Sequence, residues 1–167
     1  MTLKIGYEQA RDLLELAMEE RGFEYRYPRS DYTMCVYFDP TGGPSCIVGW
    51  VLNRLGLKFD YHCSDNSGNV LGLAKSRIIS VDVKTATLLS MAQSAQDSQW
   101  TWEHSVAYGV WAANAVESWG MNYDPADKED ELFYELQNRF GEVPDEDDMD
   151  FEELARLTAK QQEEVLV

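Results

Sequence analysis

Apolar and polar residues alternate with a helical period in several separate stretches of the chain. Between residues 7 and 21 one stripe is apolar and the other positions are mostly charged, which predicts an amphipathic helix. A second helix is expected to begin at Pro44 and to end at Gly56, and a third should span about residues 83 to 97. Gly49 lies inside the second helix, where glycine is unfavourable, so we expect another backbone or an aromatic ring to approach it closely.

The most apolar stretch is SVAYGVWAANAV, residues 105 to 116, which contains no charged residue. A helix that is apolar on every face belongs in the middle of a domain, and this stretch is too short to cross a membrane. We therefore expect it to form the central helix of the core, with Trp111 as a major packing residue and Thr101 as the residue that caps the helix.

Side chains that favour β-structure predict one or two strands near residues 23 to 27 and 32 to 38, with Asp-Pro and Gly-Gly as turn signals. The run from Ile78 to Val81 is either a further strand or an extended lead-in to the next helix. The predicted fold class is therefore α+β and predominantly helical, with about five to six helices around a central apolar helix and a small antiparallel sheet.

The pattern changes after Gly120. A helical stripe covers residues 130 to 140, and the acidic linker GEVPDEDDMD follows it. Asp150 and Glu153 resemble a capping box that opens a last helix over residues 151 to 165.

Charge divides the chain at the same place. Residues 121–167 contain 16 acidic and 4 basic residues, and so carry −12 of the net charge of −16. We expect a single domain, with a globular α+β body over residues 1–120 and an acidic helical extension over 121–167 docked on it. Such an acidic chain is not expected to bind nucleic acid or an anionic membrane directly.

Cysteine content and the start of the chain bear on the compartment. Three cysteines without a C-x-x-C pair argue against a disulfide framework, and the opening MTLKIGYEQARD lacks the basic and apolar regions of a signal peptide. No apolar run approaches the roughly 18 residues that a membrane-spanning helix needs. We expect a soluble protein of the cytoplasm.

Cys46 is the candidate nucleophile. It enters the first turn of the helix that follows GGPS, and a helix N-terminus lowers the pKa of a thiol. Catalysis would also require a base, for which the chain offers only His62 and His104. The competing interpretation, which we favour, is that Cys46 packs in the core beside Ile47 and Val48, because cysteine is among the most frequently buried residues.

Metal and cofactor sites have weaker signals. Cys35, Cys46, Cys63 and the two histidines lack the short paired spacing of structural zinc sites, and the acidic linker lacks the glycine of a calcium-binding loop. The chain also contains no nucleotide-binding, nucleophile-elbow or H-E-x-x-H motif. We expect no metal and no cofactor.

The order of several motifs is similar to that of a protein family. One helix ends in ERGFEYRYP, CVYFD follows, PSCIVGWVLNRLG spans the next helix, and LLSMAQSAQDSQWTWEHSVAYGV comes later. Residues 7 to 110 thereby resemble small proteins encoded by actinobacteriophages and their prophages, a family with no assigned activity. The resemblance implies phage origin. Trp50 stands where many members have a histidine, which weakens any proposal that needs a histidine beside Cys46.

Two functional hypotheses follow. We favour a non-enzymatic phage accessory protein that binds a host or phage protein in the bacterial cytoplasm, with acidic side chains steering it toward a basic surface. In a sharper version, the extension imitates the phosphate charge of DNA and blocks a DNA-binding protein. The alternative is a cysteine-dependent enzyme that uses Cys46 with His62 or His104. The predicted partner-binding residues are Asp145, Glu146, Asp147, Asp148, Asp150, Glu152 and Glu153.

Overall fold

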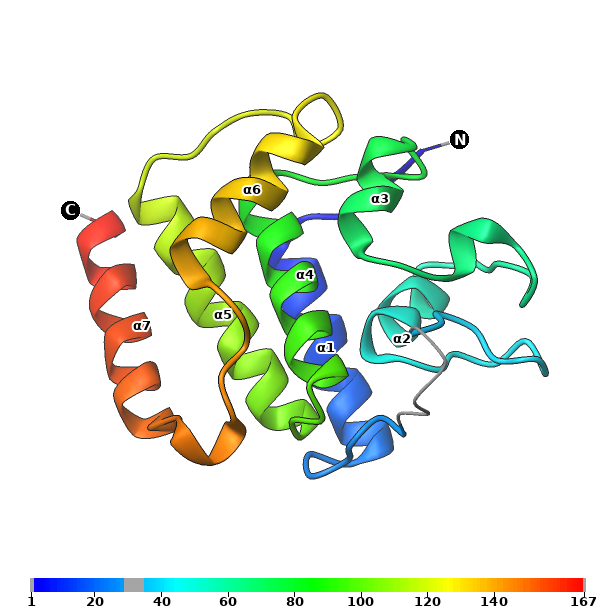
Figure 1. The fold of residues 1–167 in the computed structure, drawn as a ribbon, viewed down its shortest axis with the longest axis horizontal. Helices are drawn as coiled ribbons and strands as arrows, with labels where there is room; N and C mark the ends of the chain where they lie inside the picture. Colours follow the sequence, from blue (N-terminus) through cyan, green and yellow to red (C-terminus); the bar gives the residue numbers. More distant parts are fainter. Residues whose placement is uncertain (1, 29–34, 167) are drawn as a thin grey trace.

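The structure, a computed structural model, describes residues 2–28 and 35–166. In this part the chain forms seven α-helices, two 3₁₀ helices and two short strands (Figure 1). The α-helices are α1 (Tyr7–Arg21), α2 (Ile47–Arg54), α3 (Val70–Lys75), α4 (Val83–Asp97), α5 (Trp102–Ser118), α6 (Glu129–Phe140) and α7 (Phe151–Leu166). The remaining elements are β1 (Leu3–Lys4), β2 (Ile79–Ser80), η1 (Ser64–Asn66) and η2 (Glu146–Asp148). The predominantly helical α+β class is confirmed, with more helices than predicted.

Helix α4 is the centre of the fold. Twelve of its fifteen residues are buried, and it packs against α1, α2, α3 and α5 (Figure 1). Residues 105–116 do form a mostly buried helix of the core, as part of α5 between α4 and α7, but the helix at the centre is α4, which contacts α1, α2, α3 and α5. Trp111 is only partly buried, and its ring packs edge-on against that of Phe140 at 5.2 Å.

The hydropathy pattern does not reveal that α4 is central, because several of the buried side chains of this helix are polar. Gln93 accepts a hydrogen bond from the backbone N–H of Val70 (3.1 Å) and donates one to the carbonyl of Gly68 (2.7 Å). One turn later, Gln96 accepts a hydrogen bond from the backbone N–H of Ile47 (2.8 Å). These two amides satisfy the first backbone donors of α3 and α2, which have no partner inside their own helices.

Two glycines allow backbones to approach closely. A Cβ atom at Gly49 would lie 2.0 Å from the carbonyl oxygen of Tyr37, and a Cβ atom at Gly109 would lie 2.6 Å from the carbonyl oxygen of Leu88. The close approach that the sequence predicts at Gly49 is confirmed. Gly109 similarly allows α5 to pack tightly on α4.

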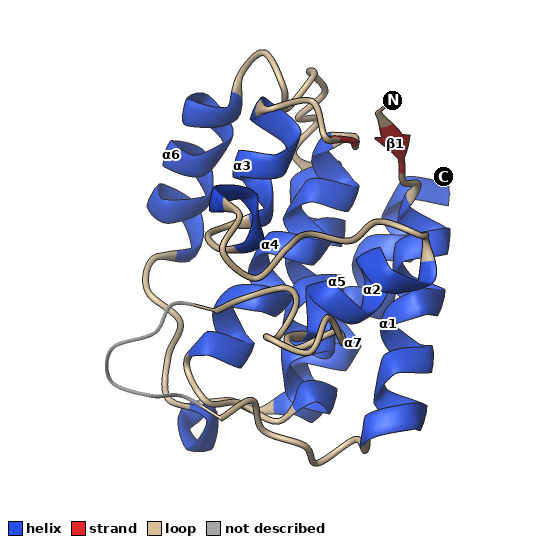
Figure 2. Cartoon of the chain, turned by 90° about the vertical axis from the view of Figure 1, so that its right-hand side faces the viewer, coloured by secondary structure: helices blue, strands red, loops and turns tan. Residues whose placement is uncertain are grey.

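The small sheet lies at one end of the helices and is parallel (Figure 2). Leu3 of β1 is opposite Ile79 of β2, and Lys4 is opposite Ser80. The run from Ile78 to Val81 therefore does include a strand. Its partner, however, is the start of the chain, which the hydropathy pattern did not mark as a strand.

The predicted antiparallel sheet over residues 23–38 is wrong. The described part of this segment makes isolated antiparallel bridges, and residues 29–34 lie outside the described part. Loops and side chains satisfy its backbone groups instead: the amide of Asn66 pairs with both the N–H and the C=O of Phe38, at 2.9 and 2.8 Å. The bridges join Arg26 to Thr101, Val36 to Ser67, and Phe38 to Pro44.

The C-terminal segment packs on the rest of the fold. Helix α6 contacts α3, helix α7 contacts α5, and Leu132, Leu136 and Leu154 are buried. At the end of α3, Lys75 pairs with Glu129 at the start of α6 (3.3 Å). The acidic extension is thus a structural part of the molecule and not a free tail.

Alanine substitutions at Gly49 and at Gly72 are expected to change the free energy of unfolding in opposite directions. Gly49→Ala drives a Cβ atom into the backbone of Tyr37, and we expect it to lower the free energy of unfolding by about 2 to 3 kcal/mol. Gly72→Ala in α3 meets no atom within 4 Å and should raise the free energy of unfolding by roughly 0.5 to 1 kcal/mol, because alanine favours the helix. Urea denaturation of both variants measures these changes. A Gly49→Ala variant as stable as the wild type would contradict the close packing.

Candidate functional site

The linker between α6 and α7 is tied by hydrogen bonds to the turn that joins α4 to α5. Trp100, which is buried in this turn, donates a hydrogen bond from its indole Nε1 to the carbonyl of Pro144 (3.0 Å). The Trp100 ring also meets the ring of Phe151, the first residue of α7, edge-on at 5.5 Å. The acidic linker is therefore anchored to the body on both sides of η2.

Glu146 is the centre of this attachment. Its Oε1 accepts hydrogen bonds from the backbone N–H of Thr101 (3.0 Å) and from the Thr101 hydroxyl (3.1 Å), and it lies 2.6 Å from His104 Nδ1. Its Oε2 pairs with the guanidinium of Arg26, which also donates to the carbonyl of Gln99. Thr101 is the N-cap of α5, as the sequence predicts, so this carboxylate lies at the positive end of the helix dipole.

The network keeps Glu146 ionised. Burial alone would raise the pKa of its carboxyl group, but the hydrogen bonds from Arg26, Thr101 and His104 outweigh burial and lower the pKa to about 2. The sequence predicts that Glu146 faces a partner. The structure instead places its charge between the linker and the body, where Arg26 compensates it.

His104 belongs to the same network. Its ring stacks on the ring of Phe151, with centroids 3.6 Å apart and planes 9° apart. Because α7 begins at Phe151, this stack holds the start of α7 against the first turn of α5. The Nδ1 atom of His104 is already occupied by Glu146.

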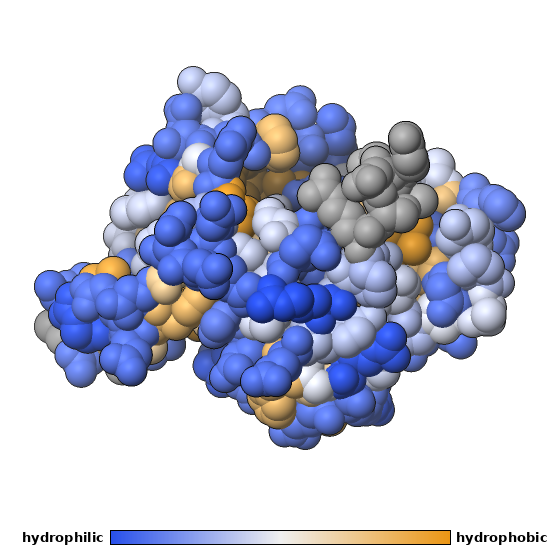
Figure 3. Space-filling model, turned by 60° about the horizontal axis from the view of Figure 1, so that its bottom comes forward, coloured by the Kyte–Doolittle hydropathy of each residue, from blue (hydrophilic) through white to orange (hydrophobic). Residues whose placement is uncertain are grey.

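The other six predicted partner-binding residues lie at the surface. Asp150 Oδ1 accepts a hydrogen bond from the backbone N–H of Glu153 (3.1 Å), as the predicted cap requires, and Glu153 pairs with Arg156 (2.7 Å). This end of the molecule is covered mainly by hydrophilic side chains (Figure 3). The six exposed residues are Asp145, Asp147, Asp148, Asp150, Glu152 and Glu153. Within residues 2–28 and 35–166, no ion-pair partner faces the carboxylates of Asp145, Asp147, Asp148 or Glu152.

Cys46 is enclosed at the start of α2. Its side chain is fully buried, and its Sγ accepts a hydrogen bond from the backbone N–H of Gly49 (3.4 Å), so the thiol acts as the N-cap of the helix. Gln96 lies against the same turn and donates a hydrogen bond to Cys35 Sγ (3.7 Å). A hydrogen bond with Cys46 and burial both raise the pKa of Cys35 above its usual value. The surroundings of Cys46 are those of a structural cysteine.

The two candidate bases do not approach Cys46. His62 is exposed and meets the ring of Tyr61, and His104 is held by Glu146 and Phe151. The described residues also contain no group of three or more His, Cys, Asp or Glu side chains that would hold a metal ion. None of the described helices combines the length and the apolar character of a membrane span.

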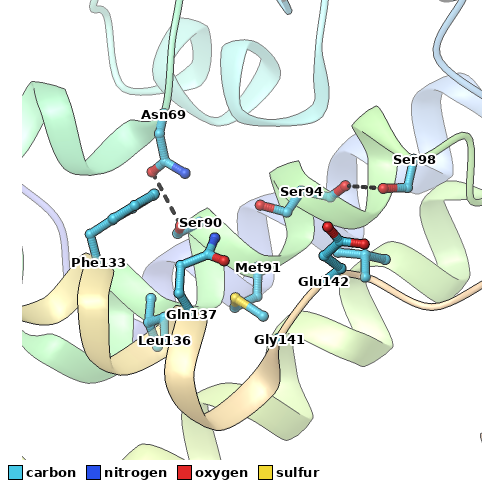
Figure 4. Close-up of a pocket in the computed structure, with 11 residues that line it drawn as sticks. Asn69, Ser90, Met91, Ser94, Ser98, Phe133, Leu136, Gln137, Gly141 and Glu142 are labelled. Atoms are coloured by element: carbon cyan, nitrogen blue, oxygen red, sulfur yellow. Dashed lines mark hydrogen bonds between the residues drawn. The ribbon is translucent and has the colours of Figure 1, made fainter.

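A cavity of about 350 Å³ opens between α4, α6 and the linker (Figure 4). Its lining mixes serine hydroxyls, the amides of Asn69 and Gln137, and apolar side chains, with Glu142 of the linker at one side. The α4 wall carries Ser90 and Ser94, with Ser98 directly after the last residue of the helix, and the α6 wall carries Phe133, Leu136 and Gln137.

A second, more open hollow of about 440 Å³ lies beside the linker. Arg26 lines it together with three exposed carboxylates, those of Asp145, Asp147 and Asp148. Ser98 lines both hollows, so they adjoin at this residue.

Neither the cavity nor the partners of Glu146 were predicted from the sequence. Serines at positions 90, 94 and 98 share one face of a helix, and this repeat was the available signal for the α4 wall. No local pattern pairs Glu146 with Arg26, because 120 residues separate them.

Replacing Glu146 by glutamine keeps the size of the side chain and removes its charge. We expect Glu146→Gln to lower the free energy of unfolding by about 2 kcal/mol at neutral pH, because charge-assisted hydrogen bonds are stronger than neutral ones. Asp147→Asn, the matched control in the same turn, should change it by less than about 0.5 kcal/mol.

The same pair of proteins tests the pKa of Glu146. Folding lowers this pKa from 4.5 to about 2, so the stabilisation is complete above about pH 4.5 and is lost as the pH falls toward 2. Urea denaturation should therefore show the difference between wild type and Glu146→Gln shrinking from neutral pH to about pH 3. A difference that does not depend on pH contradicts the network.

The burial of Cys46 predicts how the native protein reacts with a thiol reagent. We expect Cys63, which is partly exposed, to react first, and Cys35 and Cys46 to react at least about 100-fold more slowly, when the structure opens. Cys63→Ser is the control, because it should abolish the fast phase. Labelling with Ellman's reagent, followed by mass spectrometry, assigns each phase to a cysteine. Fast labelling of Cys46 in the folded protein would contradict its burial and support the enzyme hypothesis.

Comparison with known proteins assigns no family to this arrangement. No family model matches the chain, and neither the curated proteins nor the solved structures contain a match.

Proposed function

We propose that this protein is a non-enzymatic binding module that recognises a basic surface of another protein through residues 145–153. The observation that carries the proposal is the attachment of Glu146, which holds the acidic segment against the body while its neighbours Asp145, Asp147 and Asp148 face solvent. A surface that is ordered before binding loses less conformational entropy when a partner docks.

Charge supports a partner with a basic surface. The protein has a net charge of −16, most of it after residue 120, and this field steers a cationic partner toward the molecule. The resemblance of residues 7 to 110 to small phage proteins supports a host or phage protein in the bacterial cytoplasm as the partner. A DNA-binding protein is the sharper proposal, because its basic surface is shaped to meet closely spaced negative charges.

The cysteine-dependent alternative lacks a supporting contact. Cys46 is fully buried as a helix cap, and in the described part of the chain neither His62 nor His104 contacts it. We therefore propose one function.

Two variants of equal charge test whether these particular carboxylates bind the partner. The site variant neutralises four exposed side chains of the segment and retains Asp150, because this residue caps α7. The control variant neutralises four exposed side chains elsewhere. The site variant carries Asp145→Asn, Asp147→Asn, Asp148→Asn and Glu152→Gln, and the control carries Glu15→Gln, Glu19→Gln, Glu24→Gln and Asp60→Asn.

Affinity capture from host lysate, followed by quantitative mass spectrometry, compares both variants with the wild type. We expect the wild type and the control variant to capture the same partner protein, and high salt to release it. The site variant should capture at least about tenfold less of this partner. Duplex DNA added to the captured complex tests the sharper proposal, since it should displace a DNA-binding partner. If both variants capture the same proteins as the wild type, the acidic segment is not the binding surface.

A further inference from the structure

The cavity and the open hollow share the lining residue Ser98, and the two together are called the furrow. Phe133 and Leu136 lie at one end, near Ser90 (Figure 4). At the other end the furrow passes Ser98 and reaches the carboxylates of Asp145, Asp147 and Asp148. Two apolar side chains and the amide of Asn69 therefore lie at one end, and net negative charge lies at the other, where Arg26 is paired with Glu146.

The middle of the furrow offers hydrogen-bonding groups. Ser94 lies between Ser90 and Ser98 on α4, and Gln137 of α6 and Glu142 of the linker lie on the other wall (Figure 4). Hydroxyl and amide groups can both donate and accept hydrogen bonds, which an extended peptide backbone requires of its surroundings. A cavity lined by hydroxyls, amides and a carboxylate does not suit an anionic ligand.

The dimensions of α4 set the length of an occupant. Ser90 and Ser98 are eight residues apart, which corresponds to about 12 Å along a helix. An extended chain covers that distance with about four residues at roughly 3.3 Å each. An apolar residue beside Ser90 and an arginine whose backbone lies beside Ser98 are therefore about four positions apart, and the long arginine side chain extends past Ser98 toward the carboxylates.

We propose that this furrow binds an extended segment of the partner in which an apolar residue and an arginine lie about four positions apart. The apolar side chain contacts Phe133 and Leu136, and the guanidinium pairs with Asp147 and Asp148. This inference rests on the proposed function, because the acidic end of the furrow belongs to the proposed binding segment. It adds an apolar contact at Phe133 and Leu136, which charge alone does not provide. Phe133 supports that contact, because its ring is 46% exposed yet lines the cavity.

Two adjacent aromatic residues on α6 supply a matched pair of variants. Phe133 lines the cavity, whereas Tyr134 is 62% exposed and is not part of either hollow. Phe133→Ala should therefore weaken binding, and Tyr134→Ala should not. Both side chains are substantially exposed to solvent, so neither variant is expected to unfold the protein.

The probes are capped pentapeptides that are titrated into the isotope-labelled full chain and followed by NMR. Acetyl-Leu-Gly-Ser-Gly-Arg-amide and the peptide of reversed order represent the two directions in which a segment can lie. A third peptide, with serine in place of leucine, keeps the cation and removes the apolar group. We expect one of the two leucine peptides to bind saturably and to change the NMR chemical shifts of Ser94 and Gln137. Phe133→Ala should raise the Kd of that peptide by about tenfold, and Tyr134→Ala should raise it by less than about twofold.

The outcomes separate this inference from the proposed function. If the leucine and serine peptides bind equally and salt abolishes both, or if Phe133→Ala and Tyr134→Ala behave alike, the furrow is not the binding site although the acidic surface still attracts cations. Absence of saturable shifts at millimolar peptide also overturns the inference. In each case, capture of a partner that the four-residue site variant loses would leave the proposed function standing.

Discussion

The structure depends on a single constraint, which is that the first backbone amides of its helices need acceptors that the helices cannot supply. Side chains distant in sequence meet this need for three helices. Gln96 accepts from the start of α2, Gln93 accepts from the start of α3, and Glu146 accepts from the N-cap of α5. Because a buried donor without an acceptor is costly, each of these contacts fixes where one helix begins relative to another. The two glutamines do this from the centre of the fold, and Glu146 does it from the linker.

The contact made by Glu146 divides the acidic segment into an inner and an outer part. The inner carboxylate is paired with Arg26 and belongs to the fold, whereas the carboxylates of Asp145, Asp147 and Asp148 are left facing solvent. Burying one charge with a full set of partners thus orders a surface on which the neighbouring charges are exposed. Removal of residues 121–167 would uncover Trp100 and leave the start of α5 without Glu146. The function of the acidic surface is therefore better examined by neutralising charges than by truncation.

Cys46 illustrates how one local pattern supports two interpretations. A cysteine after Gly-Gly-Pro-Ser at the start of a helix suits a nucleophile and a cap equally well. The difference lies in what surrounds the thiol, and Gln96 with Cys35 closes that space from α4 and from the segment before α2. Neither Gln96 nor Cys35 belongs to the Gly-Gly-Pro-Ser-Cys pattern that suggested a nucleophile. The two histidines that the pattern offered as bases are in other parts of the structure.

Features that depend on neighbouring residues could be predicted before the fold was known. These include the helical class, the Thr101 and Asp150 caps, the close approach at Gly49 and the acidic character of the C-terminal segment, because periodicity, capping and charge are local properties. The central position of α4 could not be predicted in this way, because the buried amides of Gln93 and Gln96 are polar and their hydrogen-bond partners are distant in the sequence. The parallel pairing of β1 with β2, the inward position of Glu146 and the furrow along α4 were likewise decided only by the tertiary structure. Each of them joins segments that are far apart along the chain, and no local pattern records such a contact.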